Sequence, residues 1–509
     1  MRESDERGAG EAHKTGAAAP LRLWPVAVCL LAVAAVVAQS LYLRWTLDDA
    51  YIAFAYAQNW VLGNGLVFNV GERVEGYTSF SWVALSALGL RLKADVVPWS
   101  MGLGILAAVG TVLVTWRLAG ELMPREKRNG AVLGALLVAS YPAVGWWAPS
   151  GMETVLFALL ATLVLWRHVR DGAGSTFTPI WLALASMTRP EGCLLAAVVC
   201  ADVFRTARWP VAVRYAARFL AIFLPYCAWR LWYYGHPFPN TFYAKVGYTP
   251  DQVLRGLVYL KDFVTSGNGA ILVGGALMAP VTGIGRRAAA VYVFIVAYFG
   301  YIVLVGGDYF LFHRFFVAVV PTLAALTIAG IGRGVARLTS SNRIAGATFL
   351  LVLLLWAAAG LSLWRMERSF LPGMRSGNAL TRGVAAFARE HTRKDESIAT
   401  IIVGPMKFYS GRTVIDMVGM TDEHIAHRPA PGFGSGWAGH ERYDSRYVLG
   451  RRPRYIIVIG GVNPGAPLMA VRDMGAQPLF RKCYAQEKGT PEAGVFFFFR
   501  RIDGCTDAR

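Results

Sequence analysis

Charged residues are scarce in this chain. Only 16% of the 509 residues are Asp, Glu, Lys or Arg, whereas 55% are apolar and the mean hydropathy is +0.41. The apolar residues fall in long blocks, which excludes an ordinary soluble globular protein. A net charge of +19 would suggest nucleic acid in a soluble chain. Here much of the excess lies in short loops between apolar blocks, so we expect a polytopic membrane protein and no nucleic-acid partner.

Cysteine is also rare, and no pair of the six cysteines has metal-ligand spacing. No obligate metal site is predicted. Four cysteines lie in apolar runs and are expected to pack as small hydrophobic residues: Cys29, Cys193, Cys200 and Cys227. Cys483 and Cys505 lie in the polar C-terminal part, where a disulfide and two free thiols remain alternatives. The chain has no internal repeat.

The first apolar run extends from Leu23 to Leu43 and has an arginine at each end. About 20 apolar residues suffice to cross a hydrocarbon core of about 30 Å as a helix. The run is too long for a signal-peptide core, so we expect a retained helix after a disordered cytoplasmic tail, residues 1–20. Ten further runs give about eleven spans: 99–119, 131–148, 152–166, 178–188, 192–204, 216–234, 269–285, 288–305, 314–332 and 344–364.

The distribution of arginine and lysine orients these spans. If the N-terminus is cytoplasmic, every loop on its side is rich in basic residues, as the positive-inside rule requires. The opposite side receives most carboxylates, aromatic residues and turns. There, residues 50–62 and 79–92 are expected to form interfacial helices in the first outer loop. The short runs 178–188 and 192–204 are expected to form a hairpin whose tip is Arg189-Pro190-Glu191.

The composition changes after the last apolar run. Residues 382–392 are expected to form an amphipathic helix, and strands are expected at 397–403, 413–417, 455–459 and 495–502. This pattern predicts a small extracytoplasmic α/β domain, residues 369–509, which follows an all-α transmembrane domain, residues 21–368.

Six stretches that are far apart in sequence place polar groups at the outer ends of the predicted spans. Asp48 and Asp49 directly follow the first span, and ionisable groups at that depth are costly unless they are used or paired. We therefore expect one shared outward-facing cavity. The other candidates for it are Glu72, Glu75, Tyr77, Glu153, Arg189, Glu191, Asn240, Tyr243, Lys245, Asp308, His313 and Arg314.

Structural roles compete with each of these functional interpretations. One aspartate could cap the helix that begins at residue 50. Glu72 and Glu75 could form a local salt-bridged turn, and the Arg189 hairpin tip could hold an internal ion pair. Lys245 could be a snorkelling interfacial lysine. The Asp308 segment could be a helix stop with a cap, and His313 a structural histidine.

Several ordered stretches resemble the GT-C superfamily of membrane glycosyltransferases that use polyprenyl-phosphate sugars. Within it, the chain resembles the terminal β-arabinofuranosyltransferase family and its uncharacterised bacterial relatives. The similar stretches are Asp48-Asp49-Ala50-Tyr51, Gly63-Asn64-Gly65-Leu66-Val67-Phe68-Asn69, Gly71-Glu72-Arg73-Val74-Glu75-Gly76-Tyr77-Thr78, Ser150-Gly151-Met152-Glu153, Arg189-Pro190-Glu191-Gly192, Pro239-Asn240-Thr241-Phe242-Tyr243-Ala244-Lys245, Gly306-Gly307-Asp308-Tyr309 and Ile415-Asp416-Met417-Val418-Gly419-Met420.

The resemblance implies a GT-C-type helical bundle in the bacterial cytoplasmic membrane with its active site on the extracytoplasmic face. It implies Asp48 or Asp49 as the catalytic base and Arg189 as a contact of the donor phosphate; Lys245 and Arg314 are our secondary candidates for that phosphate. The expected reaction is inverting transfer of a sugar to an envelope glycan, glycolipid or protein. No cofactor is expected, although the paired carboxylates could hold a divalent cation.

Two other functions remain open at the level of sequence. A transporter or flippase for a lipid-linked sugar would use the same cavity, but such proteins often contain inverted repeats, which we do not find. A non-catalytic envelope assembly protein is the third alternative. The sequence leaves the donor sugar, the acceptor and the choice between the two aspartates open.

Overall fold

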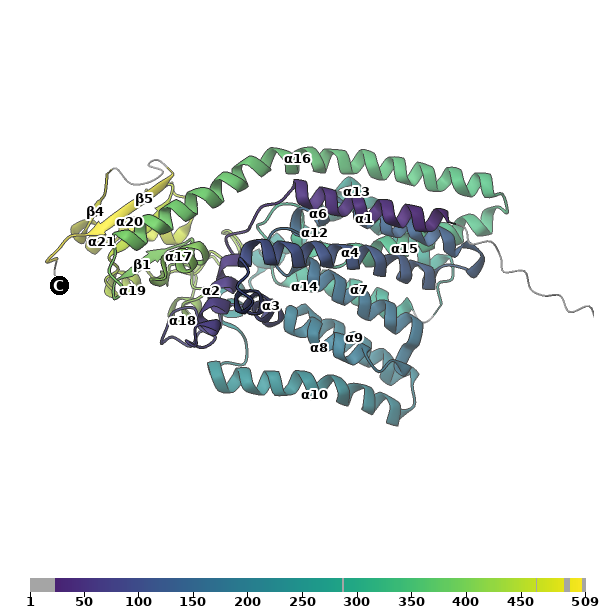
Figure 1. Ribbon diagram of the computed structural model, residues 1–509, viewed down its shortest axis with the longest axis horizontal. Helices are drawn as coiled ribbons and strands as arrows, with labels where there is room; N and C mark the ends of the chain where they lie inside the picture. The colour runs from purple at the N-terminus through teal and green to yellow at the C-terminus, as the bar shows by residue number, and fades with distance from the viewer. Residues whose placement is uncertain (1–22, 286–287, 464, 489–494, 506–509) are drawn as a thin grey trace, which may run out of the picture.

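The computed structural model describes residues 23–285, 288–463, 465–488 and 495–505. A bundle of helices occupies one end of the molecule and a small mixed sheet the other, and α16 (Asn342–Glu390) runs along both (Figure 1). The other helices of the bundle are α1 (Trp24–Tyr42), α2 (Ala50–Val61), α3 (Phe80–Arg91), α4 (Val96–Leu122), α5 (Val132–Ala139), α6 (Pro142–Trp147), α7 (Thr154–Asp171), α8 (Thr178–Thr188), α9 (Glu191–Thr206), α10 (Trp209–Tyr234), α11 (Asn240–Lys245), α12 (Pro250–Thr265), α13 (Gly267–Val281), α14 (Ala289–Leu304) and α15 (Val320–Leu338).

Among the described helices, α1, α4, α10 and α16 are long and apolar enough to cross a membrane. The pair α12 and α13, bent by 85° at their junction, could provide a fifth span. The predicted number of eleven spans is therefore not confirmed, although each predicted run contains helix. The run 131–148 is divided into α5 and α6 because Pro142 lacks the N–H that would continue the helix. Helix α12 lies between the predicted spans 216–234 and 269–285, where the sequence predicts a connection on the outer side.

The C-terminal part contains a five-stranded sheet with the order β2-β1-β3-β5-β4. Strands β1, β2 and β3 are parallel, whereas β5 is antiparallel to β3 and β4. The elements are β1 (Ser397–Thr400), α17 (Val403–Ser410), β2 (Thr413–Asp416), α18 (Glu423–Ala426), α19 (Ser445–Gly450), β3 (Tyr455–Ile459), α20 (Met469–Ala476), α21 (Pro478–Cys483), β4 (Tyr484–Gln486) and β5 (Phe496–Arg501). The four predicted strands are present; the first ends early, and β4 was not predicted.

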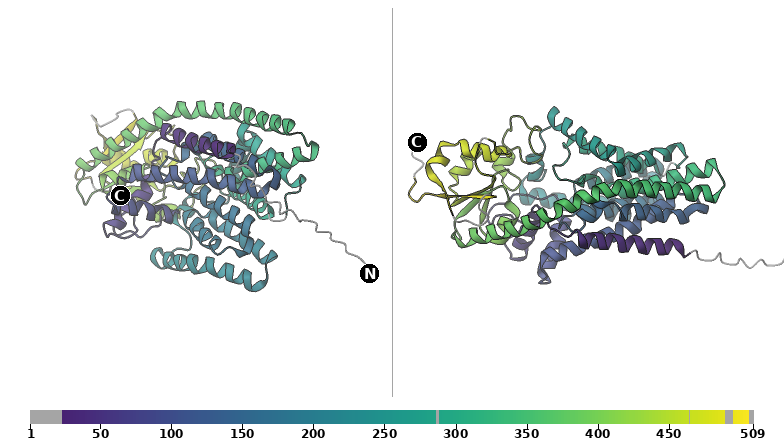
Figure 2. Two further views of the ribbon diagram at one scale, coloured as in Figure 1. Left: turned by 45° about the vertical axis from the view of Figure 1, so that its right-hand side comes forward. Right: turned by 90° about the horizontal axis from the view of Figure 1, so that it is seen from above.

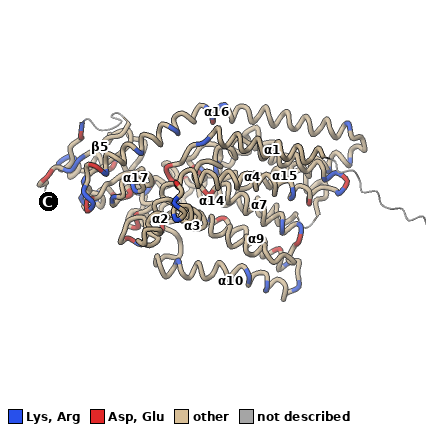
Figure 3. Tube along the Cα trace, viewed as in Figure 1, with Lys and Arg blue, Asp and Glu red and all other residues tan. Residues whose placement is uncertain are grey.

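Helix α16 joins the two parts without a break. The predicted amphipathic helix 382–392 is its last section, so the predicted domain boundary at 368/369 falls inside a continuous helix. Two further views show α16 packed along the bundle before it reaches the sheet (Figure 2). Lys and Arg gather at the end of the bundle away from the sheet, while the helices between the two ends carry few charges (Figure 3).

Cys483 and Cys505 form a disulfide with a Cα–Cα distance of 5.5 Å, which decides between the alternatives that the sequence left open. The bridge joins the end of α21 to the segment after β5. It therefore links the start of β4 to the chain that follows β5. Disulfides persist in oxidising compartments, so the bond is consistent with an outer location for this part of the chain.

Removing this bridge should destabilise the C-terminal part. The bond closes a loop of 22 residues, which corresponds to about 3 kcal/mol of unfolding free energy in the loop-entropy model. We expect the C483S/C505S variant to unfold at a lower temperature, and the Cys193→Ser variant, which replaces an exposed free cysteine, to match the wild type. Maleimide labelling of denatured, non-reduced protein provides the check: reaction at Cys483 and Cys505 without reductant would contradict the assignment.

Candidate active site

The loop between α1 and α2 is fixed to the neighbouring loop 148–153. The backbone N–H of Leu47 donates to the carbonyl of Ser150 at 2.9 Å, and the Trp45 indole donates to the carbonyl of Trp146 at 3.1 Å. Gly151 has a φ of +81°, and a Cβ there would lie 3.1 Å from the side chain of Ala50. These contacts hold the two loops together at residues that flank Asp48 and Asp49 in sequence.

The two aspartates have different surroundings. The backbone N–H of Asp49 donates to the Asp48 carboxylate at 3.0 Å, while the Asp49 side chain makes no cap hydrogen bond to α2. Capping of α2 by Asp49 is therefore not seen. Burial, and then the adjacent negative charge of Asp49, raise the pKa of Asp48 to about 7.

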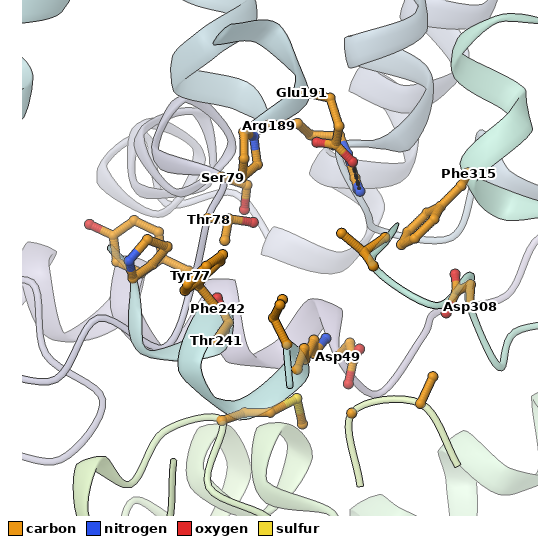
Figure 4. A pocket seen from close by; sticks show the side chains of 18 of the residues that line it. Asp49, Tyr77, Thr78, Ser79, Arg189, Glu191, Thr241, Phe242, Asp308 and Phe315 are labelled. Atoms are coloured by element: carbon orange, nitrogen blue, oxygen red, sulfur yellow. Dashed lines mark hydrogen bonds and ion pairs between the residues drawn. The ribbon is translucent and has the colours of Figure 1, made fainter. Parts of the chain in front are cut away.

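A cavity of about 320 Å³ lies between the bundle and the C-terminal part. Eight of the fourteen candidate residues line it: Asp49, Tyr77, Glu153, Arg189, Glu191, Lys245, Asp308 and Arg314. Figure 4 shows Asp49, Arg189, Glu191 and Asp308 around the same space. Met420, Ala438 and Gly439 from the C-terminal part complete the wall. The expected shared cavity is thus present in the structure.

Arg189 lies at the tip of the α8–α9 hairpin and bridges two buried carboxylates. Its Nη1 donates to Glu153 at 2.7 Å, and its Nη2 donates to Glu191 at 2.8 Å. Its Nε also points at Glu191, at 3.2 Å. The internal ion pair that the sequence offered as an alternative is present, and Glu153 adds a second partner from another loop. Two carboxylates therefore neutralise this guanidinium.

Arg314 forms the second buried ion pair of the cavity. Its Nε donates to Asp308 at 2.6 Å, and its guanidinium lies 4.5 Å from the ring centre of Phe310 and 5.4 Å from that of Phe315. Burial opposes the charge, but Asp308 outweighs this and keeps the pKa of Arg314 raised. Within the described part of the chain, its two terminal nitrogens have no hydrogen-bond partner.

Asp49 and Lys245 differ from the other charged residues of the cavity wall. Seven charged residues line the described part of the cavity wall. Five of them are ion-paired: Glu153, Glu191, Asp308, Arg189 and Arg314. Asp49 and Lys245 have no ion pair with any described residue. A carboxylate without an ionic partner can accept a proton, and an unpaired ammonium can bind an anion. The described cavity wall therefore contains one carboxylate, Asp49, and one ammonium group, Lys245, that have no ion pair.

The remaining candidate residues do not line this cavity. Glu75 and Glu72 pair with Arg230 and Arg451, which are remote in sequence, and not within a local salt-bridged turn, the structural alternative that the sequence left open. The Asn240 amide donates to the carbonyls of Gly419, Met420 and Asp422 in the C-terminal part. Asp48, Tyr243 and His313 also do not line the cavity. Tyr243 packs on His427, and the His313 ring lies among aromatic side chains.

Several residues of the site were not among the candidates. Tyr309 and Phe315 line the cavity next to the predicted Asp308 and Arg314. His440 packs edge-on against Tyr309 at 4.9 Å, and burial lowers its pKa. Tyr309 and Phe315 could have been proposed because they are adjacent in sequence to the candidates Asp308 and Arg314. His440 lies in a turn-rich stretch, where nothing in the sequence indicates that it is near the cavity.

The adjacent carboxylates of Asp48 and Asp49 could hold a divalent cation if further ligands were nearby. Among the residues that the structure describes, no group of three or more His, Cys, Asp or Glu side chains is placed to hold a metal ion. The protein side chains described here would therefore need oxygen atoms from a substrate or water to complete a coordination shell.

Comparison with known proteins supports the resemblance seen in the sequence. The chain is 31% identical over 239 residues to a terminal beta-(1->2)-arabinofuranosyltransferase of Mycobacterium tuberculosis, which covers 43% of this chain and 38% of that protein. It is 28% identical over 320 residues to the protein of the same name from Corynebacterium glutamicum, which covers 52% and 45%. The chain thus matches less than half the length of these relatives. Residues 373–496 match a family described as "Domain of unknown function (DUF8728)".

Solved structures share the fold. ArnT from Cupriavidus metallidurans, in a crystal structure with undecaprenyl phosphate, superposes with a TM-score of 0.59 at 12% identity over 96% of this chain and 99% of that chain. The Archaeoglobus fulgidus oligosaccharyltransferase with a tethered acceptor peptide gives a TM-score of 0.56 at 11% identity, over 95% and 74%. The predicted GT-C-type fold and the resemblance to arabinofuranosyltransferases are confirmed.

Replacing Asp48 by Asn should stabilise the fold above pH 7. A raised pKa means that the folded chain binds the proton more tightly than the unfolded chain. Ionisation of Asp48 therefore costs stability as the pH rises from about 4 to about 7. Asn retains an oxygen that accepts the Asp49 N–H and has no charge. In thermal unfolding of the detergent-solubilised protein, we expect a small difference near pH 4 and a midpoint higher by about 2 °C or more at pH 8.

The matched control for Asp48→Asn is Asp395→Asn. Asp395 is exposed, and its ion pair with Arg393 is long, at 3.7 Å, so its loss should change stability little at either pH. A D48N protein that is no more stable than the wild type at pH 8 would contradict the assignment of Asp48 as the destabilised carboxylate.

Asn240→Ala should loosen the contact between the bundle and the C-terminal part. The buried amide donates to three carbonyls, and each would lose a partner, at a total cost of about 2–4 kcal/mol. We expect faster limited proteolysis within residues 417–430 and a lower unfolding temperature. The control is Asn463→Ala, because the exposed Asn463 bonds only within its own turn. Equal proteolysis rates in the two variants would show that Asn240 does not hold this contact.

Proposed function

We propose that this chain is an inverting glycosyltransferase. It moves a sugar from a polyprenyl-phosphate donor to a hydroxyl of an envelope glycan, glycolipid or protein at the extracytoplasmic face of the bacterial cytoplasmic membrane. The observation that carries the proposal is the cavity in which Asp49 and Lys245 have no ionic partner while every other described charged group is paired. The similarity to arabinofuranosyltransferases and the fold shared with ArnT support it.

The proposed chemistry uses Asp49 as the general base. Its carboxylate takes the proton from the acceptor hydroxyl as that oxygen attacks the anomeric carbon of the donor sugar. The bond between this carbon and the phosphate oxygen breaks, and its electron pair leaves with the polyprenyl phosphate. Attack on the side opposite the leaving group inverts the configuration. Asp48 is the weaker candidate because it does not line the cavity and accepts the backbone N–H of Asp49.

The leaving phosphate gains negative charge, and cations aimed at it lower the barrier. Lys245 has an ammonium group without an ion pair among the described residues. Arg314 keeps both terminal nitrogens for a ligand because Asp308 uses only its Nε. We assign the phosphate to these two residues, with Arg189 as a third donor whose charge Glu153 and Glu191 already balance. A bound divalent cation would add positive charge here, and a chelator tests that contribution.

The orientation is also part of the proposal. The basic residues at the far end of the bundle support a cytoplasmic location for that end (Figure 3). The Cys483–Cys505 disulfide supports an oxidising compartment for the C-terminal part. The cavity lies at this second end, where a lipid-linked donor would keep its chain in the bilayer and its sugar in the cavity.

Asp49→Asn should lower sugar transfer by at least about a hundredfold, because loss of a general base removes a factor of roughly 10²–10⁴. Purified protein is supplied with polyprenyl-phosphate donors carrying arabinofuranose, mannose, glucose or galactose, together with crude envelope acceptor. Transfer is measured as release of polyprenyl phosphate. Lys245→Ala should also lower turnover, whereas Asp48→Asn should have a smaller effect than Asp49→Asn.

Two outcomes separate this proposal from its rivals. Full transfer by both asparagine variants would exclude the aspartate mechanism. Binding of a donor by the wild type without turnover of any donor would favour a transporter or an assembly protein. Thermal unfolding of each variant controls for loss of fold.

A further inference from the structure

A tryptophan is exposed beside the cavity on a glycine-rich loop. We call residues 430–441 the rim loop, of which Ala438 and Gly439 line the cavity. Trp437 precedes them and is 52% exposed, although an indole of this size is normally covered. Its ring stacks on Tyr309, with centres 6.4 Å apart and planes within 14° of parallel. Since Tyr309 lines the cavity, Trp437 lies at its edge with one face already supported.

This exposure is not the result of a loosely held loop. Arg255 of α12 donates through Nη1 to the carbonyls of Gly434 and Gly436 and to the Glu441 carboxylate, at 2.9–3.2 Å. Glu441 in turn accepts the N–H groups of Gly434 and Gly436. Gly434 has a φ of +104°, and a Cβ there would lie 2.3 Å from the backbone nitrogen of Gln252. The rim loop is therefore bonded to α12 on both sides of Trp437.

The aromatic contact continues from Trp437 into the cavity. Tyr309 packs on Phe310 with ring centres 4.0 Å apart, and Phe310 packs on Arg314, to which we assign the donor phosphate. His440 lies edge-on to Tyr309, and the Lys245 side chain lies beside Gly439. A series of aromatic contacts thus connects Trp437 to the cavity wall, with His440 and Lys245 beside it.

These features suit a sugar ring better than a peptide or a lipid chain. A pyranose or furanose ring has an apolar C–H face and a rim of hydroxyls, which match an aromatic plane flanked by polar groups. An acyl chain would need a deep apolar groove. An extended peptide would need a row of free backbone partners, whereas the N–H groups of Gly434 and Gly436 are already bonded within the rim loop.

We propose that Trp437 is the platform of an acceptor subsite and that the acceptor is a glycan whose sugar ring stacks on its exposed face. This inference rests on the proposed function and narrows its acceptor from three classes to one. Arg255 and Glu441 are positioning residues, because they hold the rim loop and do not line the cavity. The acceptor hydroxyl then enters past Tyr309 toward Asp49.

The test compares Trp437→Ala with Trp437→Phe and with Trp209→Ala. Trp209 is 71% exposed on α10, at the opposite end of the bundle, and so controls for loss of an exposed indole. With the full-length protein in detergent, oligosaccharides of arabinofuranose, mannose, glucose or galactose are offered as acceptors. We expect the KM for the oligosaccharide to rise about tenfold in W437A, which equals about 1.4 kcal/mol. W437F should recover most of the affinity, and W209A should match the wild type.

Calorimetric titration of the oligosaccharides without donor separates the two proposals. If W437A loses oligosaccharide binding while the wild type turns over no donor, the acceptor subsite stands and the enzyme assignment fails. An unchanged KM and unchanged oligosaccharide binding in W437A overturn the subsite, as does a loss confined to kcat. Wild-type transfer to serine peptides or lipid alcohols, with no response to oligosaccharides, also overturns it.

Discussion

The bridge from Arg189 to Glu153 and Glu191 is the interaction on which the cavity depends. It joins the start of α7 to the tip of the α8–α9 hairpin, with all three side chains largely excluded from water. Ionised groups at such a place are tolerated only when they are paired and hydrogen-bonded. Removing Arg189 would leave two buried carboxylates without a cation, at a cost of about 3–5 kcal/mol. Because the charges of this bridge are paired with one another, Asp49 and Lys245 are the charged groups of the described cavity wall without an ion pair.

The C-terminal part is a wall of the cavity and not an appended module. A Cβ at Gly404 of α17 would lie 2.4 Å from the backbone oxygen of Asp48, so α17 approaches the aspartates as closely as backbone allows. Asn240 donates hydrogen bonds to backbone carbonyls of the same part, and α16 enters it without interruption. The C-terminal part therefore contacts the bundle next to Asp48 and at Asn240, and α16 joins the two parts.

The sequence predicted the parts of the site that depend on local position. Asp49 and Arg189 were found because each lies where an apolar run ends, and that property needs no tertiary structure. The partners of Glu75 and Glu72 could not be found in this way, because Arg230 lies within an apolar helix and Arg451 is in the C-terminal part. Asn240 was expected to bind a ligand because its partners, too, cannot be recognised from the sequence. Its amide proved to bind backbone carbonyls that only the folded C-terminal part brings near.

The unequal environments of the two aspartates explain how adjacent carboxylates can serve one reaction. The Asp48 carboxylate accepts the backbone N–H of Asp49 and does not line the cavity, and burial raises its pKa to about 7. Near neutral pH it therefore carries a proton for much of the time, which reduces the repulsion on Asp49. In the proposed mechanism Asp48 is a neighbouring carboxyl group, and Asp49, which lines the cavity, is the one placed to meet substrate.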